Sequence, residues 1–227
     1  MPRTRPFDEH ATEYDRWFDR NPLVYESELE AVRALMPSHR SAVEVGVGTG
    51  RFAVPLGIRT GVEPSHAMAA LARRRGVEVV EAVGEELPFG DGVFDLVLMV
   101  TTVCFLDNVD RAFDEAHRVL EQGGHFIVGF LDREAPLGSR YEARKGESDY
   151  YRIARFVSSE DMLAGLDRAG FGDLVAVQTI FEPSEDMEER SPVEPGHGRG
   201  LFVVVRGRRA VHQPQWKGEA PACQSSS

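Results

Sequence analysis

The stretch "AVEVGVGTGRF" at 42–52 constrains the fold more than any other part of the chain. An apolar, β-branched run leads into three glycines at alternate positions, and this pattern is typical of a turn from a strand into a helix. Glycine has no Cβ atom, so a ligand can approach the backbone N–H groups of such a turn closely. The loop that contains Gly46, Gly48 and Gly50 is therefore predicted to bind a cofactor.

Short apolar runs alternate with helical segments from residue 42 onward. This alternation predicts βαβ units, and therefore an α/β, Rossmann-like, doubly wound sheet that is mostly parallel and covered by helices on both faces. Two later β-rich runs have no helix between them, so we expect them to pair antiparallel and to make the last strand antiparallel. The predicted strands are 42–46, 58–62, 77–81, 94–100, 125–131, 174–180 and 200–207, and the predicted helices are 65–75, 108–120 and 158–169.

The two ends of the chain differ from this central part. Residues 8–36 are predicted to form two helices that are interrupted near Asn21 and Pro22. We therefore expect a helical N-terminal cap at 1–40 and one α/β domain at 41–207. The segment 208–227 is rich in polar and turn-forming residues, and is predicted to be a disordered tail.

Composition excludes several classes of protein. A formal net charge of -11 argues against a broad contact with nucleic-acid phosphates. No apolar run is long enough to cross a bilayer, and the N-terminus lacks the apolar core of an export signal. Two cysteines in 227 residues suit a reducing compartment. A cytoplasmic protein without a nucleic-acid or membrane partner is expected, as a monomer or a homodimer.

A carboxylate follows the second predicted strand. Glu63 lies 17 residues after Gly46, and a carboxylate at that strand tip can accept both hydroxyl groups of a ribose, as in nucleoside cofactor sites. The rival interpretation is a dinucleotide site. Its pattern needs room for a pyrophosphate, whereas here the bulky Arg51 and Phe52 follow the last glycine, so a pyrophosphate fits poorly.

Four segments together resemble a known family. "VEVGVGTGRF", "GVEPS", "EELPFGDGVFDLVLMV" and "AHRVLEQGGHFIVGF" are similar, in order and spacing, to the motifs of class I S-adenosylmethionine-dependent methyltransferases. The similarity extends over residues 8–206 and is greatest to the small-molecule branch that includes menaquinone and ubiquinone methyltransferases. "VTTVCFLDN", "ARFVSSEDM" and "GHGRGLFVVVRG" further resemble a group of small prokaryotic methyltransferases.

The resemblance implies a cofactor, S-adenosylmethionine, and a set of residues around it. The glycine loop would contact the methionine part, Glu63 the ribose and the next turn the adenine. The family often has Asp-Ala where this chain has Val83 and Gly84, so backbone groups would read the adenine edge here. The implied cofactor residues are Glu44, Gly46, Gly48, Gly50, Glu63, Pro64, Met68, Gly84, Glu85 and the carbonyl of Val100, with Thr101 and Thr102 bordering the reacting centre.

The chemistry expected from this resemblance is methyl transfer to the nitrogen or oxygen of a small molecule. Such a reaction needs alignment and exclusion of water more than a fixed catalytic constellation. Three side chains are candidates for a catalytic role: Tyr14, Asp107 and His197. Tyr14 can instead serve in packing and Asp107 in capping the next helix, while the histidines show no metal-ligand spacing.

Two alternatives and the charge of the substrate stay open. An NAD-linked oxidoreductase and a cofactor-binding protein without turnover are the rival functions. The acidic segment 181–190 favours a cationic substrate if it borders the pocket. The tyrosine-rich segment 141–155 is slightly basic and favours the opposite.

Overall fold

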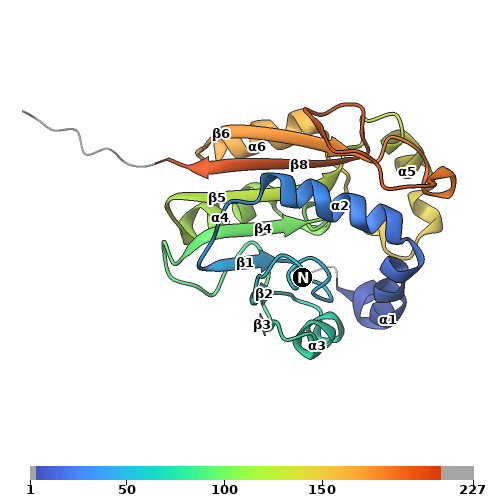
Figure 1. The fold of residues 1–227 in the computed structure, drawn as a ribbon. Coiled ribbons are helices and arrows are strands. Elements are labelled where there is room, and N and C mark those ends of the chain that lie inside the picture. The colour runs from blue at the N-terminus through green and yellow to red at the C-terminus, as the bar shows by residue number, and fades with distance from the viewer. Residues whose placement is uncertain (1–3, 211–227) are drawn as a thin grey trace, which may run out of the picture.

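The computed structural model describes residues 4–210, and its centre is one mixed sheet (Figure 1). The strand order is β3-β2-β1-β4-β5-β8-β6-β7. The strands are β1 (Ala42–Val45), β2 (Thr60–Val62), β3 (Glu78–Val80), β4 (Phe94–Val100), β5 (Leu120–Leu131), β6 (Phe171–Thr179), β7 (Glu194–Pro195) and β8 (Phe202–Arg209).

Five neighbouring strands are parallel and the sheet ends antiparallel. Strands β3, β2, β1, β4 and β5 pair in parallel, whereas β8 runs antiparallel to both β5 and β6. The predicted doubly wound sheet with an antiparallel last strand is therefore confirmed. The two-residue strand β7, which pairs with β6, was not predicted. A strand of this length, with Pro195 in it, leaves no periodic signal.

Five helices lie near their predicted places, and a sixth, Gly138–Arg144, was not predicted. They are α1 (Arg5–Arg20), α2 (Pro22–Leu35), α3 (His66–Arg74), α4 (Val109–Val119), α5 (Gly138–Arg144) and α6 (Ser159–Arg168). Asn21 separates α1 from α2, so the interruption lies near Asn21 and Pro22 as predicted, and Pro22 is the first residue of α2. The side chains of Ser65, Asn108 and Ser158 accept N-capping hydrogen bonds from backbone N–H groups at the starts of α3, α4 and α6.

Alternate residues of β4 point into two different cores. Leu96 and Leu98 pack on the side covered by α2, whereas Val97 and Met99 pack on the side covered by α4 and α6. This two-sided burial explains why the strand is a continuous apolar run rather than an alternating one. Figure 1 shows α2 lying across the front of the sheet, with α4 and α6 behind it.

The segment after the glycine loop differs from the predicted helix. Residues 51–57 form successive turns with two helical hydrogen bonds, from Val54 to Gly50 and from Leu56 to Phe52. Pro55 has no N–H to donate to the carbonyl of Arg51, and the hydroxyl of Tyr25 donates to that carbonyl instead, at 2.5 Å. A helix of regular geometry is therefore not maintained here.

Two predicted boundaries also shift. Strand β5 begins at Leu120, five residues before the predicted 125, because Leu120 already pairs with Phe94 before the register shifts. Gly123 and Gly124 therefore lie inside the strand rather than ahead of it. Strand β8 continues to Arg209, into the predicted tail, of which 211–227 lie outside the described residues.

The N-terminal helices have two different positions. Helix α1 lies at the lower right of Figure 1, at the end toward which the carboxyl ends of the parallel strands point. Helix α2 contacts β5, β6 and β8 and belongs to the core of the α/β unit.

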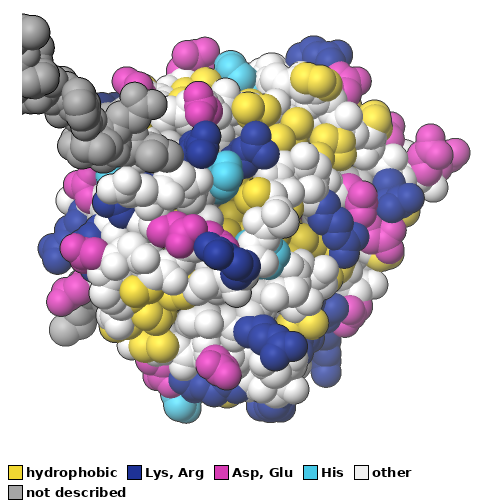
Figure 2. All heavy atoms as spheres, turned by 60° about the vertical axis from the view of Figure 1, so that its left-hand side comes forward, with side chains coloured by type: hydrophobic (Ala, Val, Ile, Leu, Met, Phe, Trp, Pro, Cys, Tyr) yellow, Lys and Arg dark blue, Asp and Glu magenta, His cyan; other side chains and the backbone are white. Residues whose placement is uncertain are grey.

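Figure 2 shows the opposite end of the molecule, where basic and acidic side chains are interspersed over the coloured atoms. No helix in the described part of the chain has both the length and the apolar character of a membrane span.

Candidate cofactor and active site

A cavity of about 370 Å³ opens at the carboxyl ends of the parallel strands. This is the edge at which doubly wound sheets bind their ligands. Its walls come from the loops after β1, β2, β3 and β4 and from α1. The lining residues are Thr4, Phe7, Tyr14, Val45, Gly46, Gly48, Glu63, Pro64, Met68, Ala82, Val83, Gly84, Glu85, Glu86, Val100, Thr101, Thr102, Phe105, Leu106, Asp107, Asn108 and Arg111.

The three glycines of the first loop have different roles. Gly46 has a φ of 72°, and a Cβ atom there would lie 2.3 Å from Oγ1 of Thr102. Gly48, with a φ of 53°, lines the cavity and has no atom within 4 Å of its Cβ position, so the space beside it is open for a ligand. Gly50 lies outside the cavity lining, and a Cβ there would contact Val77 at 3.3 Å. The last glycine therefore serves packing rather than ligand contact.

Glu63 has a buried carboxylate at the floor of the cavity. Its oxygens accept hydrogen bonds from the backbone N–H groups of Gly48, at 2.9 Å, and Ser65, at 2.8 Å. Burial raises the pKa of Glu63 to about 7, although these two hydrogen bonds favour the charged form. Because each carboxylate oxygen can accept two hydrogen bonds, both keep capacity for hydroxyl donors. The geometry suits a vicinal diol.

Glu44 lies behind the glycine loop rather than in the cavity. One of its oxygens accepts a hydrogen bond from the backbone N–H of Ala53. The other, Oε2, has no hydrogen-bond partner within residues 4–210. Burial holds the pKa of Glu44 well above its ordinary value. We expect Glu44 to support the turn after the loop, since it is absent from the cavity lining.

Four further residues that the family resemblance implies for the cofactor also line the cavity. Pro64, Met68, Gly84 and Glu85 all line it, and Met68 is 1% exposed. The side chain of Glu85 accepts hydrogen bonds from the backbone N–H groups of Asp107 and Asn108. It is thus occupied in holding the loop before α4, which leaves backbone groups to face a ligand.

The end of β4 brings a strained backbone to the cavity. Thr101 has a φ of 49°, which is uncommon for a residue with a branched side chain. Its N–H donates to the carbonyl of Gly129, at 2.8 Å, and this bond anchors the turn to β5. The hydroxyl of Thr102 donates to the carbonyl of Val100, at 2.9 Å. Strained backbone of this kind concentrates at functional sites.

Asp15 attaches α1 to the glycine loop, a role that the sequence analysis missed. Its carboxylate accepts hydrogen bonds from Arg51, Arg75 and Thr49 at 2.7–2.9 Å. Burial works against the charged form, but these hydrogen bonds outweigh it and lower the pKa of Asp15 to about 2. The signal available in the sequence was an acidic residue beside Tyr14 and a basic residue directly after the last glycine.

The three catalytic candidates are not brought together. Tyr14 and Asp107 line the cavity, and burial raises the pKa of Tyr14 above its ordinary value. Asp107 does not cap α4, because Asn108 does so. His197 lies in the loop after β7 and is not among the residues that line this cavity.

The topology explains the position of His197. Its loop is bound to Gln178 on β6, through the N–H groups of Arg199 and Gly200. Two strands, β5 and β8, separate β6 from β4, which amounts to about 14 Å at the usual strand spacing of about 4.8 Å. Within residues 4–210, no group of three His, Cys, Asp or Glu side chains is arranged to hold a metal.

The fold and this cavity are those of a Rossmann-like, cofactor-binding α/β protein. A family model described as a methyltransferase domain matches residues 43–128. The malonyl-[acyl-carrier protein] O-methyltransferase of Geobacter sulfurreducens is 35% identical to this chain and covers 88% of it, with 79% of its own length matched. An uncharacterized protein of Methanocaldococcus jannaschii is 42% identical to this chain. The match covers 89% of this chain and 98% of the length of that protein.

The solved structures agree with these relatives. A crystal structure from Thermotoga maritima, of an S-adenosylmethionine-dependent methyltransferase described as a possible histamine N-methyltransferase, superimposes with a TM-score of 0.88 at 48% identity. The match covers 91% of this chain and 99% of the Thermotoga maritima chain. This chain belongs to the class I S-adenosylmethionine-dependent methyltransferases. S-adenosylmethionine is its cofactor, and the buried carboxylate of Glu63 and the open space beside Gly48 fit that molecule.

Proposed function

We propose that this methyltransferase transfers the methyl group to a nitrogen or oxygen atom of a small molecule. The observation that carries the proposal is the cavity at the strand ends, which is lined both by the buried carboxylate of Glu63 and by residues at the end of β4. Helix α1 covers it, so the acceptor must be small enough to enter beside that helix. We further infer that the protein acts in the cytoplasm, without a nucleic-acid or membrane partner.

The residues around the cavity perform three tasks. When bound, S-adenosylmethionine supplies a methyl group on a positively charged sulfur, which leaves with the bonding electron pair when a nucleophile attacks. Glu63 binds the ribose, and the backbone of Gly48 allows close approach of the ligand. Tyr14, Phe7 and Phe105 exclude water from the region beside Thr101, since their rings cluster in edge contacts.

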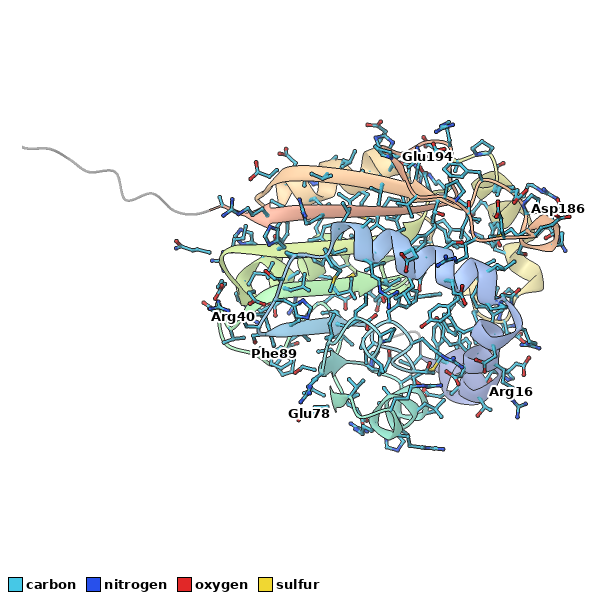
Figure 3. The ribbon with its side chains drawn as sticks, in the orientation of Figure 1. Arg16, Arg40, Glu78, Phe89, Asp186 and Glu194 are labelled. Carbon is cyan, nitrogen blue, oxygen red and sulfur yellow. The ribbon has the colours of Figure 1, made fainter. Side chains whose placement is uncertain are left out.

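The acidic segment 181–190 does not set the charge of this cavity. Glu182, Glu185, Asp186, Glu188 and Glu189 are all exposed. Figure 3 shows Asp186 at the outer right-hand edge of the molecule, directed away from the sheet. We infer that most of this segment is a solvated loop and that buried residues determine which acceptor binds.

An amine is the acceptor that the relatives support best. The Thermotoga maritima protein is described as a possible histamine N-methyltransferase, whereas the Geobacter sulfurreducens relative methylates oxygen. Because the first is 48% identical and covers 91% of this chain, amines belong at the head of an acceptor panel. Phenols and carboxylates follow.

Two measurements test the proposed function. S-adenosylhomocysteine should raise the melting temperature, whereas NADH should not, because only a ligand that binds the folded state stabilises it. The reverse result would contradict the cofactor assignment. Methyl transfer is then measured with labelled S-adenosylmethionine and the acceptor panel. Slow methyl consumption with every acceptor would favour a binding protein without turnover.

The ribose assignment has its own variant. Replacing Glu63 by alanine should weaken binding of S-adenosylhomocysteine about tenfold or more, because two charge-assisted hydrogen bonds are lost. Glu78→Ala is the matched control, since Glu78 is exposed at the far end of β3 and projects outward in Figure 3. Unchanged affinity in a folded Glu63→Ala protein would show that the ribose lies elsewhere.

A further inference from the structure

A second cavity, with a volume of about 280 Å³, lies between α5, the turns that follow it and the loop after β6. Figure 1 shows α5 and this loop at the right-hand end of the molecule. In the described part of the chain, none of the residues that line this cavity lines the cofactor cavity. Its volume is close to the lower limit of about 300 Å³ for small-molecule sites. The second cavity is therefore a separate space that suits a ligand of about one ring.

Three basic side chains line the second cavity, those of Arg140, Arg144 and Lys145. Lys145 forms an ion pair with Glu142. Arg140 is exposed, and its side chain forms no ion pair or hydrogen bond with a described residue. A guanidinium group carries five N–H donors in a planar fork that fits the oxygens of a carboxylate or a phosphate. The donors of Arg140 are thus available to a ligand.

Glu185 is the acidic residue among the described residues that line this cavity. Its pKa is lowered by a hydrogen bond from its own backbone N–H, by one from the hydroxyl of Ser184 and by the charges of Arg140 and Arg144. The side chain of Glu185 is exposed and lies beyond ion-pair distance from Arg140. An exposed carboxylate can turn toward solvent when an anion binds. Positive charge therefore exceeds negative charge along the described lining.

Hydroxyl groups add neutral donors to the same lining. Burial raises the pKa values of Tyr141 and Tyr151, so both phenols stay protonated at neutral pH. Neither phenol hydroxyl has a hydrogen-bond partner among the described residues. The oxygen of Ser148 accepts hydrogen bonds from the N–H groups of Tyr150 and Tyr151, at 3.3 and 3.2 Å, and its own proton remains to be donated. A lining rich in donors favours a ligand group that only accepts.

The remaining surface of the second cavity is apolar. Leu137, Pro183 and the rings of Tyr141 and Tyr151 contribute to it, and the two ring centroids lie 6.2 Å apart at an interplanar angle of 66°. Aromatic rings at such distances offer faces and edges to a further ring. An inorganic anion would leave this apolar surface uncovered, whereas an anion with an aromatic body would cover it.

We propose that the second cavity binds a small aromatic acid, whose oxyanion group pairs with Arg140 and Arg144 and whose ring lies against the two tyrosines, Tyr141 and Tyr151. Charge-assisted hydrogen bonds from a guanidinium group to a carboxylate or a phosphate are about twice as strong as neutral ones. The inference goes beyond the methyl transfer proposed above and does not depend on it, because the ligand contacts residues outside the cofactor cavity.

The test compares ligands that differ in charge. The acids are phenyl phosphate and phenylacetate, and 2-phenylethanol and 2-phenylethylamine are the neutral and cationic counterparts. Binding is measured by calorimetry on the full chain saturated with S-adenosylhomocysteine, which keeps the probes out of the cofactor cavity. The acid that binds more tightly identifies the oxyanion, and it should bind at least tenfold more tightly than the alcohol or the amine.

Two variants of opposite sign locate the site. Arg140→Gln should weaken binding of that acid at least fivefold, because charge-assisted hydrogen bonds are lost. Glu185→Gln should strengthen it about threefold, because a repelling carboxylate is removed. Arg152→Gln is the matched control, since Arg152 is exposed next to Tyr151 but does not line the cavity, and it should leave the affinity unchanged.

The results that would overturn the inference are distinct. One is a wild-type protein that binds neither acid more tightly than the alcohol and the amine. Another is a folded Arg140→Gln protein that is weakened no more than Arg152→Gln, since the loss would then reflect net charge rather than this cavity. If Arg140→Gln does not fold, Glu185→Gln decides the question, and unchanged or weaker binding in that variant would count against the site. Stabilisation by S-adenosylhomocysteine leaves the proposed function standing in each case.

Discussion

Replacing Glu28 by glutamine should change how the stability of the protein depends on pH. The carboxyl of Glu28 is 5% exposed, and burial raises its pKa from 4.5 to about 8. It binds a proton more tightly in the folded than in the unfolded chain. Its favourable contribution is therefore complete below pH 4.5 and is lost as the pH rises toward 8. Glutamine has the same shape and cannot ionise, so the variant escapes this loss.

The size of the effect follows from the shift in pKa. One pKa unit corresponds to about 1.4 kcal/mol, so the wild-type protein loses about 2 kcal/mol of its free energy of unfolding by pH 6 and about 4 kcal/mol by pH 8. Glu28→Gln should accordingly be the more stable protein at pH 8. At about 2–4 °C per kcal/mol, its melting temperature should exceed that of the wild type by about 10 °C.

Urea unfolding at several pH values between 5 and 8.5 measures this difference directly. Glu26→Gln serves as the control, because Glu26 is exposed on the same helix and should show no comparable trend. A difference between Glu28→Gln and wild type that stays constant across this range would refute the reasoning, since it would mean that the carboxyl is solvated.

Three other perturbations test the site. The first uses 5′-methylthioadenosine, which has the ribose but no amino acid part. Its affinity, measured by calorimetry, should rise about tenfold from pH 6 to 8, because Glu63 ionises with a pKa of about 7. Glu63→Gln should abolish this pH dependence. Asp15→Asn should lower the free energy of unfolding at pH 7 by about 1–2 kcal/mol, allowing for partial solvent screening. In acid titrations this difference in stability between wild type and variant should vanish near pH 2, because Asp15 is then protonated. Gly46→Ala should lose cofactor binding in thermal shift assays, because the new methyl group would lie 2.3 Å from Thr102, whereas Gly57→Ala, with no atom near its Cβ position, tests the cost of a positive φ alone.

Much of the fold could be predicted from the sequence because its signals are local. The cap at Ser65 and the stop at Gly76 both act within one helix and could be read directly. The lack of a regular helix after Gly50 depends in part on Tyr25, whose hydroxyl reaches the carbonyl of Arg51 only in the folded protein. The early start of β5 likewise depends on pairing with β4, whose register no local pattern reveals.

Some residues of the site could likewise be predicted from local signals, and others could not. Gly46, Gly48 and Glu63 were expected to lie together because strand ends converge at one edge of the sheet. Asp15 was missed because its partners are 34, 36 and 60 residues away along the chain. The burial of Glu28 was missed because the apolar stripe of α2 was identified from its apolar members, although a lone carboxylate within such a stripe is itself a signal.

The attachment of α1 has a consequence for the timing of turnover. Asp15 joins this helix to the glycine loop, and Asp8 accepts a hydrogen bond from Ser65 at the start of α3, at 2.6 Å. A ligand that orders the loop must also order α1, and by reciprocity an ordered α1 retains the ligand. We therefore expect the N-terminal helix to affect the residence time of the ligand as well as the shape of the cavity. Amide hydrogens of α1 should exchange more slowly when S-adenosylhomocysteine is bound, and product should leave no faster than this helix detaches.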